Sequence, residues 1–594
     1  PDDLIEESEL DAIAGECDAE EVCNGVDDDC NDVIDDVMGT PYCGDGCCNN
    51  EETSETCDDC ICRPPLTPVL AAPRNGEKLQ TPTPLFQWLR ASGSCGAPRY
   101  HLQVDDVCIV AHLPECEFAD PAVDEKDVET TSFQPAEALA LPEELPRVAR
   151  YFWRVRSCYD GEVCSEWSLP KYVDIGRTES DLDGDGVPDI AVGIELADGT
   201  AVDEGKVHVF YWDEPVHYVP PSLVIHNPFA NTSAFFGYSL DGRGDLNGDG
   251  YGDLVVGAPG QDGVESEEGA VFVYYGYETG ISGEPLVILR SPEHQQWSGF
   301  GAGVTSSGDF NGDRLSDVAV GAERMEIEAG EEGAVYVYYG SLEGISEDAD
   351  LTLHSPYHQE GGRFGASLAS AGDLNRDGFD DLSVGAYMHD GALAGQGVVF
   401  VFFGSSEGLS EEASIGIDCP DDFALRFGQS VTSSGDLNGD GYDDLAVGSP
   451  GVGEEAFESG GLFIIYGNDV DFSVYLFDAV NNPDEAGTQG LGTSTAIVGD
   501  VNMDGYDDVA AGALGRPGVY GKVFMFEGTQ EFSVRRPGRS IVGTVDDLGH
   551  DITPAGDLNA DGVSDFVLTS QLTTGDEGAL VYYGMEFCCR LFLE

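Results

Sequence analysis

The residues best suited to chemistry are short runs of aspartate and asparagine, and one of the clearest extends from Asp436 to Asp444. Carboxylate or amide oxygens occupy positions 1, 3, 5 and 9 of this run, and Gly441 occupies position 6. Oxygens at alternate positions of a curling chain converge on one point, and the glycine permits a turn that brings in the carbonyl of residue 7. This is the ligand pattern of the first part of an EF-hand calcium loop. An all-oxygen, flexible site favours Ca2+ over Mg2+.

The same spacing occurs seven times after residue 177, and successive starts are 64, 64, 64, 63, 64 and 57 residues apart. We expect one Ca2+ in each loop, held by four side chains and by the carbonyl at position 7, so about seven ions in this region. The predicted ligands are Asp181, Asp183, Asp185, Val187, Asp189; Asp245, Asn247, Asp249, Tyr251, Asp253; Asp309, Asn311, Asp313, Leu315, Asp317; Asp373, Asn375, Asp377, Phe379, Asp381; Asp436, Asn438, Asp440, Tyr442, Asp444; Asp500, Asn502, Asp504, Tyr506, Asp508; and Asp557, Asn559, Asp561, Val563, Asp565.

These runs are more than ordinary turns. Aspartate, asparagine and glycine are common turn formers, but all seven runs keep all four ligand positions, although Arg314 replaces the position-6 glycine of the third. The run at Asp436 lacks the position-12 glutamate of an EF-hand and leads directly into the apolar residues 445–448. We therefore expect structural clamps rather than switches, because clustered carboxylates repel one another until a cation binds.

The elements that position these loops are short strands. Each repeat of roughly 63 residues contains a segment before the loop such as Phe364–Leu368, a segment after it such as Leu445–Gly448, an aromatic segment such as Gly333–Gly340, and a shorter apolar run such as Leu351–Leu353. Strands this apolar suit sheets that neighbours cover on both faces. Seven such sheets closed in a ring form a β-propeller, so we predict an all-β fold with a seven-bladed β-propeller over residues 177–594.

A known repeat matches this arrangement. A Phe-Gly strand, the aspartate run and then Gly257-Ala258-Pro259 resemble the FG-GAP repeat of integrin α-subunit propellers. The resemblance implies a calcium-bearing propeller, although integrin propellers fill only some of their loops, whereas all seven loops here keep their carboxylates. The first unit lacks a Phe-Gly strand before Asp181. Its inner strand is expected from around Tyr172 to Ile175, or the ring closes by borrowing a strand.

Residues 63–176 predict a β-sandwich. A proline-rich linker precedes alternating or aromatic segments at residues 85–88, 100–104 and 151–156, and these have the pattern of strands. The position of Trp88 in an early strand and of Ser165-Glu166-Trp167-Ser168 before the last resembles a fibronectin type III domain. Such domains serve as spacers or make weak protein contacts. Cys158 with Cys164, and Cys108 with Cys116, are placed to close hairpins, which leaves Cys95 over.

Residues 1–62 predict a small disulfide-rich segment, because nine of the seventeen cysteines lie there. Asp27, Asp29, Asn31 and Asp35 repeat the 1, 3, 5, 9 spacing, with Asp32 in place of the glycine, and suggest one further cation. Residues 23–36 resemble the MopE-like metal-binding motif of secreted bacterial proteins. The alternatives are an acidic spacer without a specific ion, and a zinc site built on Cys57, Cys60 and Cys62.

Composition restricts the function classes. Asp and Glu outnumber Lys and Arg 113 to 26, so the formal charge is −87, a surface that disfavours binding to nucleic acid and anionic lipid. No apolar run is long enough for a transmembrane segment. Clustered cysteines indicate an oxidising compartment, so we expect a secreted, extracellular or cell-surface protein whose signal peptide has been removed. An odd number of cysteines leaves one thiol free or bonded to another chain.

Three functions are compatible with these patterns. The favoured one is a non-catalytic, calcium-binding adhesion or structural protein that contacts extracellular protein or glycan, or assembles with itself through its termini or edge strands. The alternatives are a lectin-like propeller and a polysaccharide-active enzyme on the same scaffold, although the sequence contains neither HExxH nor GxSxG. Arg243-Gly244-Asp245 spells a known adhesion motif, but Asp245 begins a predicted calcium loop and should point inward. Residues 587–593 are expected to complete the last blade or to pair with another copy.

Overall fold

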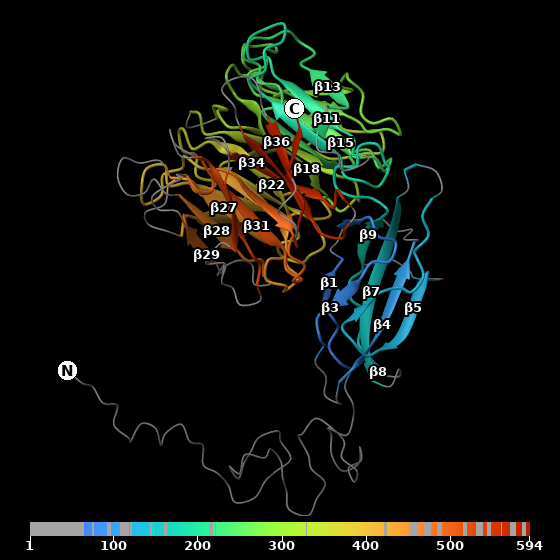
Figure 1. Ribbon diagram of the computed structural model, residues 1–594. Coiled ribbons are helices and arrows are strands. Elements are labelled where there is room, and N and C mark those ends of the chain that lie inside the picture. The colour runs from blue at the N-terminus through green and yellow to red at the C-terminus, as the bar shows by residue number, and fades with distance from the viewer. Residues whose placement is uncertain are drawn as a thin grey trace, which may run out of the picture.

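The fold is known from a computed structural model, whose regular elements within the described part of the chain are all strands. The structure describes residues 64–593 apart from short gaps, and the gaps of six residues or more are 107–117, 452–459, 469–476, 484–489, 530–537 and 571–577. The predicted disulfide-rich segment and Asp27, Asp29, Asn31 and Asp35 lie outside the described residues, as do Cys95, Cys108 and Cys116. The described chain forms a ring of sheets with a smaller pair of sheets beside it (Figure 1).

The smaller unit consists of two sheets that share one core. The first contains β1 (Leu70–Ala72), β3 (Phe86–Trp88) and β6 (Ser132–Phe133). The second contains β2 (Glu77–Leu79), β9 (Lys171–Ile175), β7 (Ala149–Tyr159), β4 (Arg99–Asp105), β5 (Val123–Val128) and, beside β7, β8 (Val163–Cys164). Phe86 of the first sheet packs on Trp153 of the second with ring centroids 5.1 Å apart, and both side chains are completely buried. The aromatic residues that mark these strands in the sequence therefore form the core.

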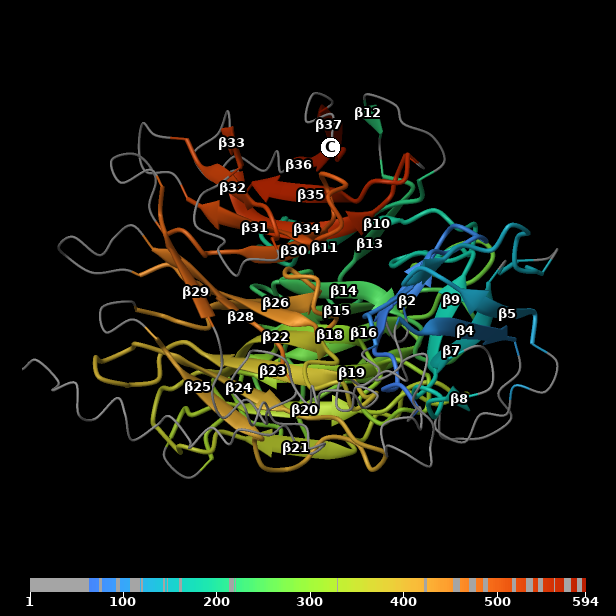
Figure 2. The same ribbon diagram turned by 90° about the horizontal axis from the view of Figure 1, so that it is seen from below.

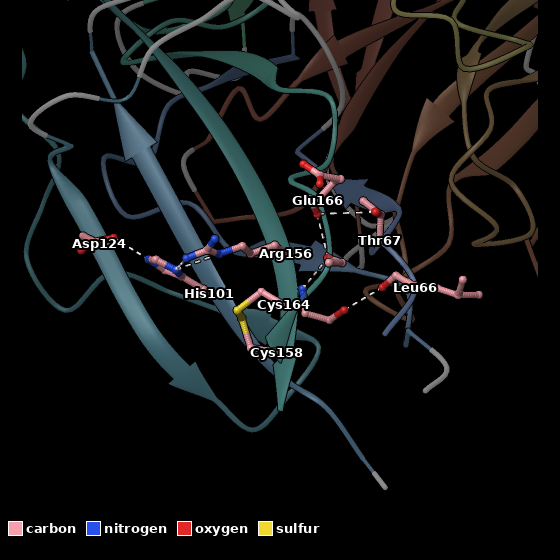
Figure 3. The surroundings of a disulfide bond; sticks show 10 residues. Leu66, Thr67, His101, Asp124, Arg156, Cys158, Cys164 and Glu166 are labelled. Atoms are coloured by element: carbon pink, nitrogen blue, oxygen red, sulfur yellow. Dashed lines mark hydrogen bonds and ion pairs between the residues drawn. A yellow bond between two sulfur atoms is a disulfide. The ribbon is translucent and has the colours of Figure 1, made fainter. Parts of the chain in front are cut away.

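One predicted disulfide is confirmed. Cys158 of β7 and Cys164 of β8 are bonded with an S–S distance of 2.06 Å, so the bond closes the hairpin between the two strands (Figure 3). The Ser157 hydroxyl beside it donates to the carbonyl of Leu66 at 2.6 Å, which ties the start of the described chain to β7. The bond and this contact together hold the end of the two-sheet unit that lies far from the ring.

The ring contains seven sheets within the described residues, and their order follows the chain. The first sheet contains β10 (Ile190–Ile194), β11 (Lys206–Phe210) and β13 (Leu223–His226), and the last contains β34 (Leu548–Gly556), β35 (Asp565–Ser570), β36 (Gly578–Tyr582), β37 (Arg590–Leu593) and β12 (Tyr218–Val219). The second to fourth sheets contain β14 (Ser239–Gly244), β15 (Asp253–Ala258), β16 (Ala270–Tyr274) and β17 (Val287–Leu289); β18 (Phe300–Gly308), β19 (Asp317–Ala322), β20 (Ala334–Tyr338) and β21 (Leu351–His354); and β22 (Phe364–Gly372), β23 (Asp381–Ala386), β24 (Val398–Phe402) and β25 (Ile415–Asp418). The fifth and sixth sheets contain β26 (Ser430–Gly435), β27 (Asp444–Ser449), β28 (Gly461–Ile465) and β29 (Phe477–Asn481); and β30 (Thr495–Gly499), β31 (Asp508–Ala513), β32 (Lys522–Phe526) and β33 (Arg539–Val542). Neighbouring strands are antiparallel except where β12 joins β37.

Hydrophobic clusters between neighbouring sheets hold the ring together. Strands such as β15 and β16 are buried along their whole length because another sheet covers each face. One cluster joins Val271 of the second sheet to Tyr336 of the third, and similar clusters join each later pair. Phe210 of the first sheet packs with Val581 of the last, so the first and last sheets also share a cluster. The sheets therefore enclose a central axis.

The ring closes by packing of the first sheet against the last, and the prediction that Tyr172 to Ile175 supplies the first inner strand is wrong. Those residues form β9, which pairs with β7 on one side and with β2 on the other, so both of its edges are occupied within the smaller unit. The first sheet has three strands in the described chain. Its connecting segment instead contributes β12, which runs parallel to β37 with Tyr218 opposite Phe592. The C-terminal strand therefore completes the last sheet.

Candidate metal centres

The seven aspartate runs all lie at the same place in their repeats. In the second sheet, β14 ends at Gly244, the run begins at Asp245, and β15 begins at Asp253, which is position 9. The five later sheets also begin their second strand at position 9, and in the first sheet β10 begins one residue beyond Asp189. The structure therefore places every predicted loop immediately before a strand of its sheet, and in the second to seventh sheets a strand of the same sheet also precedes the loop.

The position-1 and position-5 carboxylates fold back into each loop. In the second loop, Asp245 accepts the backbone N–H groups of Gly248 at 2.8 Å and Gly250 at 3.0 Å, and Asp249 accepts the N–H of Tyr251 at 3.0 Å. All seven loops repeat the bonds from position 6 to position 1 and from position 7 to position 5. Gly250 has φ +93°, a conformation that favours glycine. These bonds wind each loop around one point.

Position 9 joins each loop to its sheet. Asp253 is completely buried, and its two oxygens accept the N–H groups of Leu246 at 2.8 Å and Gly276 at 2.9 Å. Leu246 is position 2 of the same loop, and Gly276 follows the third strand of the sheet. Equivalent pairs of bonds occur at the other six position-9 aspartates. This carboxylate is therefore a structural support as well as a candidate ligand.

The electrostatics of the loops fit a bound cation. Burial, followed by the charges of Asp245 and Asp249, raises the pKa of Asp253 well above its ordinary value. Burial and neighbouring loop carboxylates also raise the pKa of Asp508 and Asp565 to about 7. In the first loop, ligand oxygens of Asp181, Asp183 and Asp189 lie within 4.8 Å of one another. Ionising several buried carboxylates around one point is unfavourable without a positive charge, and a divalent cation supplies that charge.

These pKa shifts predict how stability depends on pH when metal is removed. A carboxyl group whose pKa is about 7 in the folded chain and 3.8 in its ordinary state binds its proton more tightly in the folded chain. Its contribution to stability is complete below about pH 4 and is lost as the pH rises through about 7. With a chelator present, we expect the urea concentration at the midpoint of unfolding to decrease as the pH rises from 5 to 8. The difference between the midpoint in calcium and the midpoint in chelator should therefore widen over the same range. A difference that did not change with pH would contradict this electrostatic account.

The third loop departs from the pattern because it contacts the two-sheet unit. Arg314 holds position 6 with φ +76°, where the other loops have glycine. Its guanidinium lies over the ring of Phe152 at 5.0 Å, and its carbonyl accepts a hydrogen bond from Arg150 at 3.0 Å. The substitution that weakens the loop pattern in the sequence therefore serves a contact between domains.

Sequence reasoning missed the residues at position 8, which link the second to sixth loops to the preceding loop. Asp380 accepts the N–H of Asp309 at 2.9 Å, and its own N–H donates to the Asp309 carbonyl at 3.1 Å. Asp507 forms the same two bonds with Asp436, at 2.8 Å and 3.2 Å. The signal was present as an Asp-Asp doublet in the fourth, fifth and sixth loops. The first aspartate of each doublet reaches the neighbouring loop, and local spacing singles out only the second.

The side chain at position 7 makes a second contact between neighbouring loops. Tyr251 lies against Gly184, where an added Cβ would come within 2.5 Å of its ring, and Phe379 lies in the same way against Gly312. In the fourth loop, Arg376 replaces the position-4 glycine and stacks on Tyr442 at 3.9 Å. The position-7 residue was predicted only as a carbonyl ligand. Its side chain also sets the distance between neighbouring loops.

The Arg-Gly-Asp sequence is engaged within the fold. Arg243 pairs with Asp241 at 2.9 Å, and Arg177 pairs with Asp245 at 2.9 Å. Asp245 also accepts the two backbone bonds of its loop, so both charged side chains of the motif have partners within the chain. The motif lies in the junction between the ring and the two-sheet unit.

Comparisons with known proteins agree with the repeat structure. The family described as "FG-GAP repeat" matches residues 236–274, 300–338, 364–402 and 427–477. Integrin alpha-PS5 of Drosophila melanogaster is 39% identical over 159 residues, which cover 26% of this chain and 15% of that protein. Integrin alpha-5 of Xenopus laevis is 32% identical over 272 residues, covering 44% and 24%, and human integrin alpha-IIb is 34% identical over 230 residues, covering 37% and 20%. The fold and repeats define an integrin-like β-propeller.

The chain spans between 15% and 24% of the length of these integrin subunits. A solved structure titled "Structure of Dos1 propeller" aligns with a TM-score of 0.34 and 14% identity, over 58% of this chain and 70% of that one, too weak a likeness to argue from. No helix among the described residues is long and apolar enough to span a membrane. The similarity therefore establishes the repeats and the type of ring, and the role of the whole protein is a separate inference.

Proposed function

We propose that this chain is a secreted or cell-surface calcium-binding protein with a non-catalytic adhesion or structural role. The observation that carries the proposal is the set of seven loops, each with its position-1, position-5 and position-9 carboxylates hydrogen-bonded into one wound turn. In each loop the residues at positions 1, 3, 5 and 9 and the position-7 carbonyl would hold one ion. Calcium would neutralise the charge of the loop carboxylates, and the wound loop would fix the positions of the ligand oxygens.

The proposed scaffold is a seven-bladed propeller with a fibronectin type III-like sandwich. The seven sheets and the clusters between them support the blade count, because the contact of Phe210 with Val581 joins the first sheet to the last. The six-stranded and three-stranded sheets that share Phe86, Trp88 and Trp153 support the sandwich. A rigid ring with a second domain attached suits presentation of a binding surface better than it suits a small-molecule enzyme.

The adhesion role rests on similarity to integrin alpha subunits and on chemistry. The paired Cys158 and Cys164 fit an oxidising, extracellular environment, and millimolar calcium outside cells would keep weak loops filled. A formal charge of −87 favours partners that are neutral or basic, or that bind through bridging calcium. Extracellular protein and glycan are therefore the partners that we propose.

A lectin-like function is the second candidate because one hollow on the ring has suitable residues. Phe229, which is 41% exposed, lies beside Asn231, Asp262 and Arg290 in this hollow. Asn231 donates to Asp262 at 2.6 Å and also accepts its N–H at 3.0 Å, so the polar groups are held in place. An exposed aromatic face beside fixed amide and carboxylate groups is a common way to bind a sugar ring.

Self-association is constrained by the way the last sheet is completed. β37 pairs with β36 and with β12, so both of its edges are covered within the chain. We propose that copies would instead associate through the outer strands of other sheets, such as β21 and β25. Sizing and electron microscopy in calcium distinguish the outcomes, since a protein that is monomeric at all concentrations would exclude assembly.

Binding assays on the whole chain test these functions against one another. The protein is immobilised and exposed to extracellular-matrix proteins and to a glycan array, in calcium and in chelator, and acidic polysaccharides are assayed for product release. Calcium-dependent binding to protein without turnover supports adhesion. Binding confined to glycans would replace adhesion with the lectin function, and product release would show an enzyme.

A further inference from the structure

We propose that the two-sheet N-terminal unit, residues 64–175, completes the ring of metal loops, so that its docking and cation binding strengthen each other. This inference rests on the proposed calcium binding and adds positioning residues that lie outside the loops. The unit lies against the end of the ring where the loops are, and both views of the molecule show this arrangement (Figures 1 and 2). Nothing in the loop sequences themselves indicates that a second domain takes part.

The N-terminal unit contacts backbone atoms of several loops. Gln80 donates to the carbonyl of Gly186 at 2.8 Å, and Arg150 donates to the carbonyl of Arg314 at 3.0 Å. Both acceptors are position-6 carbonyls, in the first and third loops. In the second loop, an added Cβ at position 6, Gly250, would come within 2.6 Å of Pro146. Three successive loops therefore present the same position to the N-terminal unit.

The contact made by Gln80 lies between the seventh and first loops, where the series of backbone hydrogen bonds between neighbouring loops is interrupted. The carbonyl of a position-1 aspartate normally accepts the position-8 N–H of the next loop, as Asp181 does from Gly252 at 2.6 Å. Between the seventh and first loops, position 8 is Pro188, which has no N–H to donate. Gln80 donates to the Asp557 carbonyl at 3.4 Å, in addition to its bond to Gly186. A side chain of the N-terminal unit therefore bridges the two loops at the seam.

The same junction brings basic and acidic side chains together. Five of the 26 lysines and arginines line one cavity of about 110 Å3 between the two units, namely Lys78, Arg150, Arg177, Arg243 and Arg314, and six carboxylates line it with them, those of Asp174, Glu179, Asp245, Asp309, Asp380 and Asp443. Arg177, only 2% exposed, lies in the connection between the units and pairs with Asp245, position 1 of the second loop. Arg177 therefore places a buried positive charge beside a loop carboxylate, whereas Arg150 and Arg243 pair with Asp174 and Asp241, which lie outside the loops.

The direction of the coupling follows from which groups the N-terminal unit contacts. The Gly186 and Arg314 carbonyls take their present positions only when position 6 is wound over the position-1 carboxylate, as the bonds from Gly186 to Asp181 and from Arg314 to Asp309 show. A cation favours that wound state because it holds the carboxylates together. Docking selects the same state, so each event increases the affinity of the other by the same factor.

Replacing Gln80 by methionine tests the coupling, with Gln134→Met as its matched control. Gln134 also donates to a carbonyl, that of Thr83 at 2.9 Å, but this bond lies within the N-terminal unit. Both changes remove an amide donor and keep the side chain long and uncharged. For Gln80→Met in the full chain, we expect the weakest calcium-binding step in calorimetry to become about three- to tenfold weaker, because one or two hydrogen bonds are lost. Gln134→Met should bind calcium as the unaltered chain does.

Urea unfolding in calcium and in chelator separates coupling from a merely structural role. Coupling predicts that Gln80→Met lowers the unfolding midpoint in calcium and has a smaller effect in chelator, whereas a structural contact would lower both equally. Equal losses in the two conditions, or unchanged calcium affinity, would overturn the inference while leaving calcium binding intact. If the unaltered chain binds no calcium, the proposed function fails first, and that result is distinct.

Discussion

Replacing Asp444 by asparagine is expected to destabilise the protein by about 3 to 5 kcal/mol in excess calcium. Asp444 is completely buried, and its two oxygens accept the N–H groups of Leu437 at 2.8 Å and Gly467 at 3.0 Å. Asparagine offers one acceptor oxygen, and its amide group would face the second N–H donor. One buried donor would lose its partner, and the fifth loop would lose a charged ligand.

Asp440→Asn in the same loop is the control. Asp440 accepts the N–H of Tyr442 at 3.0 Å through one oxygen, and asparagine can keep that bond. This change should cost about 1 kcal/mol in calcium, because a charge at the cation is lost, and should slightly stabilise the chain in chelator, because one of the mutually repelling carboxylates is removed. Urea unfolding of both variants, with and without calcium, provides the comparison. If Asp444→Asn proved as stable as the unaltered chain in calcium, position 9 would not be the support described above.

Removal of calcium from the whole chain is expected to have the largest effect. A site occupied at 100 times its dissociation constant contributes about 2.7 kcal/mol to stability, and the contributions of independent sites add. Seven loops of this kind would supply more stability than most folded domains possess. We therefore expect excess EDTA to lower the melting temperature strongly at pH 8, where the loop carboxylates repel one another most.

Adding calcium or magnesium back to the EDTA-treated chain provides the controls for this melting experiment. Adding calcium beyond the EDTA concentration should restore the original melting temperature, and magnesium at the same free concentration should restore less, because the wide loops suit higher coordination numbers. The Cys158–Cys164 disulfide is unaffected by chelation, so the two-sheet unit has a support that does not depend on metal. A melting temperature that is the same in EDTA and in calcium would show that the loops hold themselves together without ions.

The local part of this fold could be predicted from the sequence because it is encoded within single repeats. The aspartate run, the apolar segment after it and the aromatic strand lie within about forty residues, and in six of the seven sheets the loop has the predicted position between the first two strands. The spacing of ligands specifies where the side chains of one loop converge. For the same reason, local spacing identifies Asp253 and its equivalents as the last member of each run.

Contacts between repeats could not be predicted in this way. The position-8 carboxylate of Asp380 has no place in the ligand spacing, because its partner is the backbone of Asp309 in the preceding repeat. Arg314 looked like a defect, because its partner Phe152 belongs to another domain. The first inner strand was misassigned because Tyr172 to Ile175 has the apolar pattern of a strand, and its pairing with β7 and β2 depends on distant residues. Local spacing carries no information about such distant partners.

Counting the calcium ions bound to the intact chain tests the central claim most directly. Native mass spectrometry at about 1 mM free calcium, supported by calorimetry, should find seven ions per chain, or eight if Asp27, Asp29, Asn31 and Asp35 also form a site. Asp440→Asn should remove or weaken one of them and leave the others. A folded chain that binds no calcium under these conditions, or a count that does not change when loop carboxylates are replaced, would contradict the account.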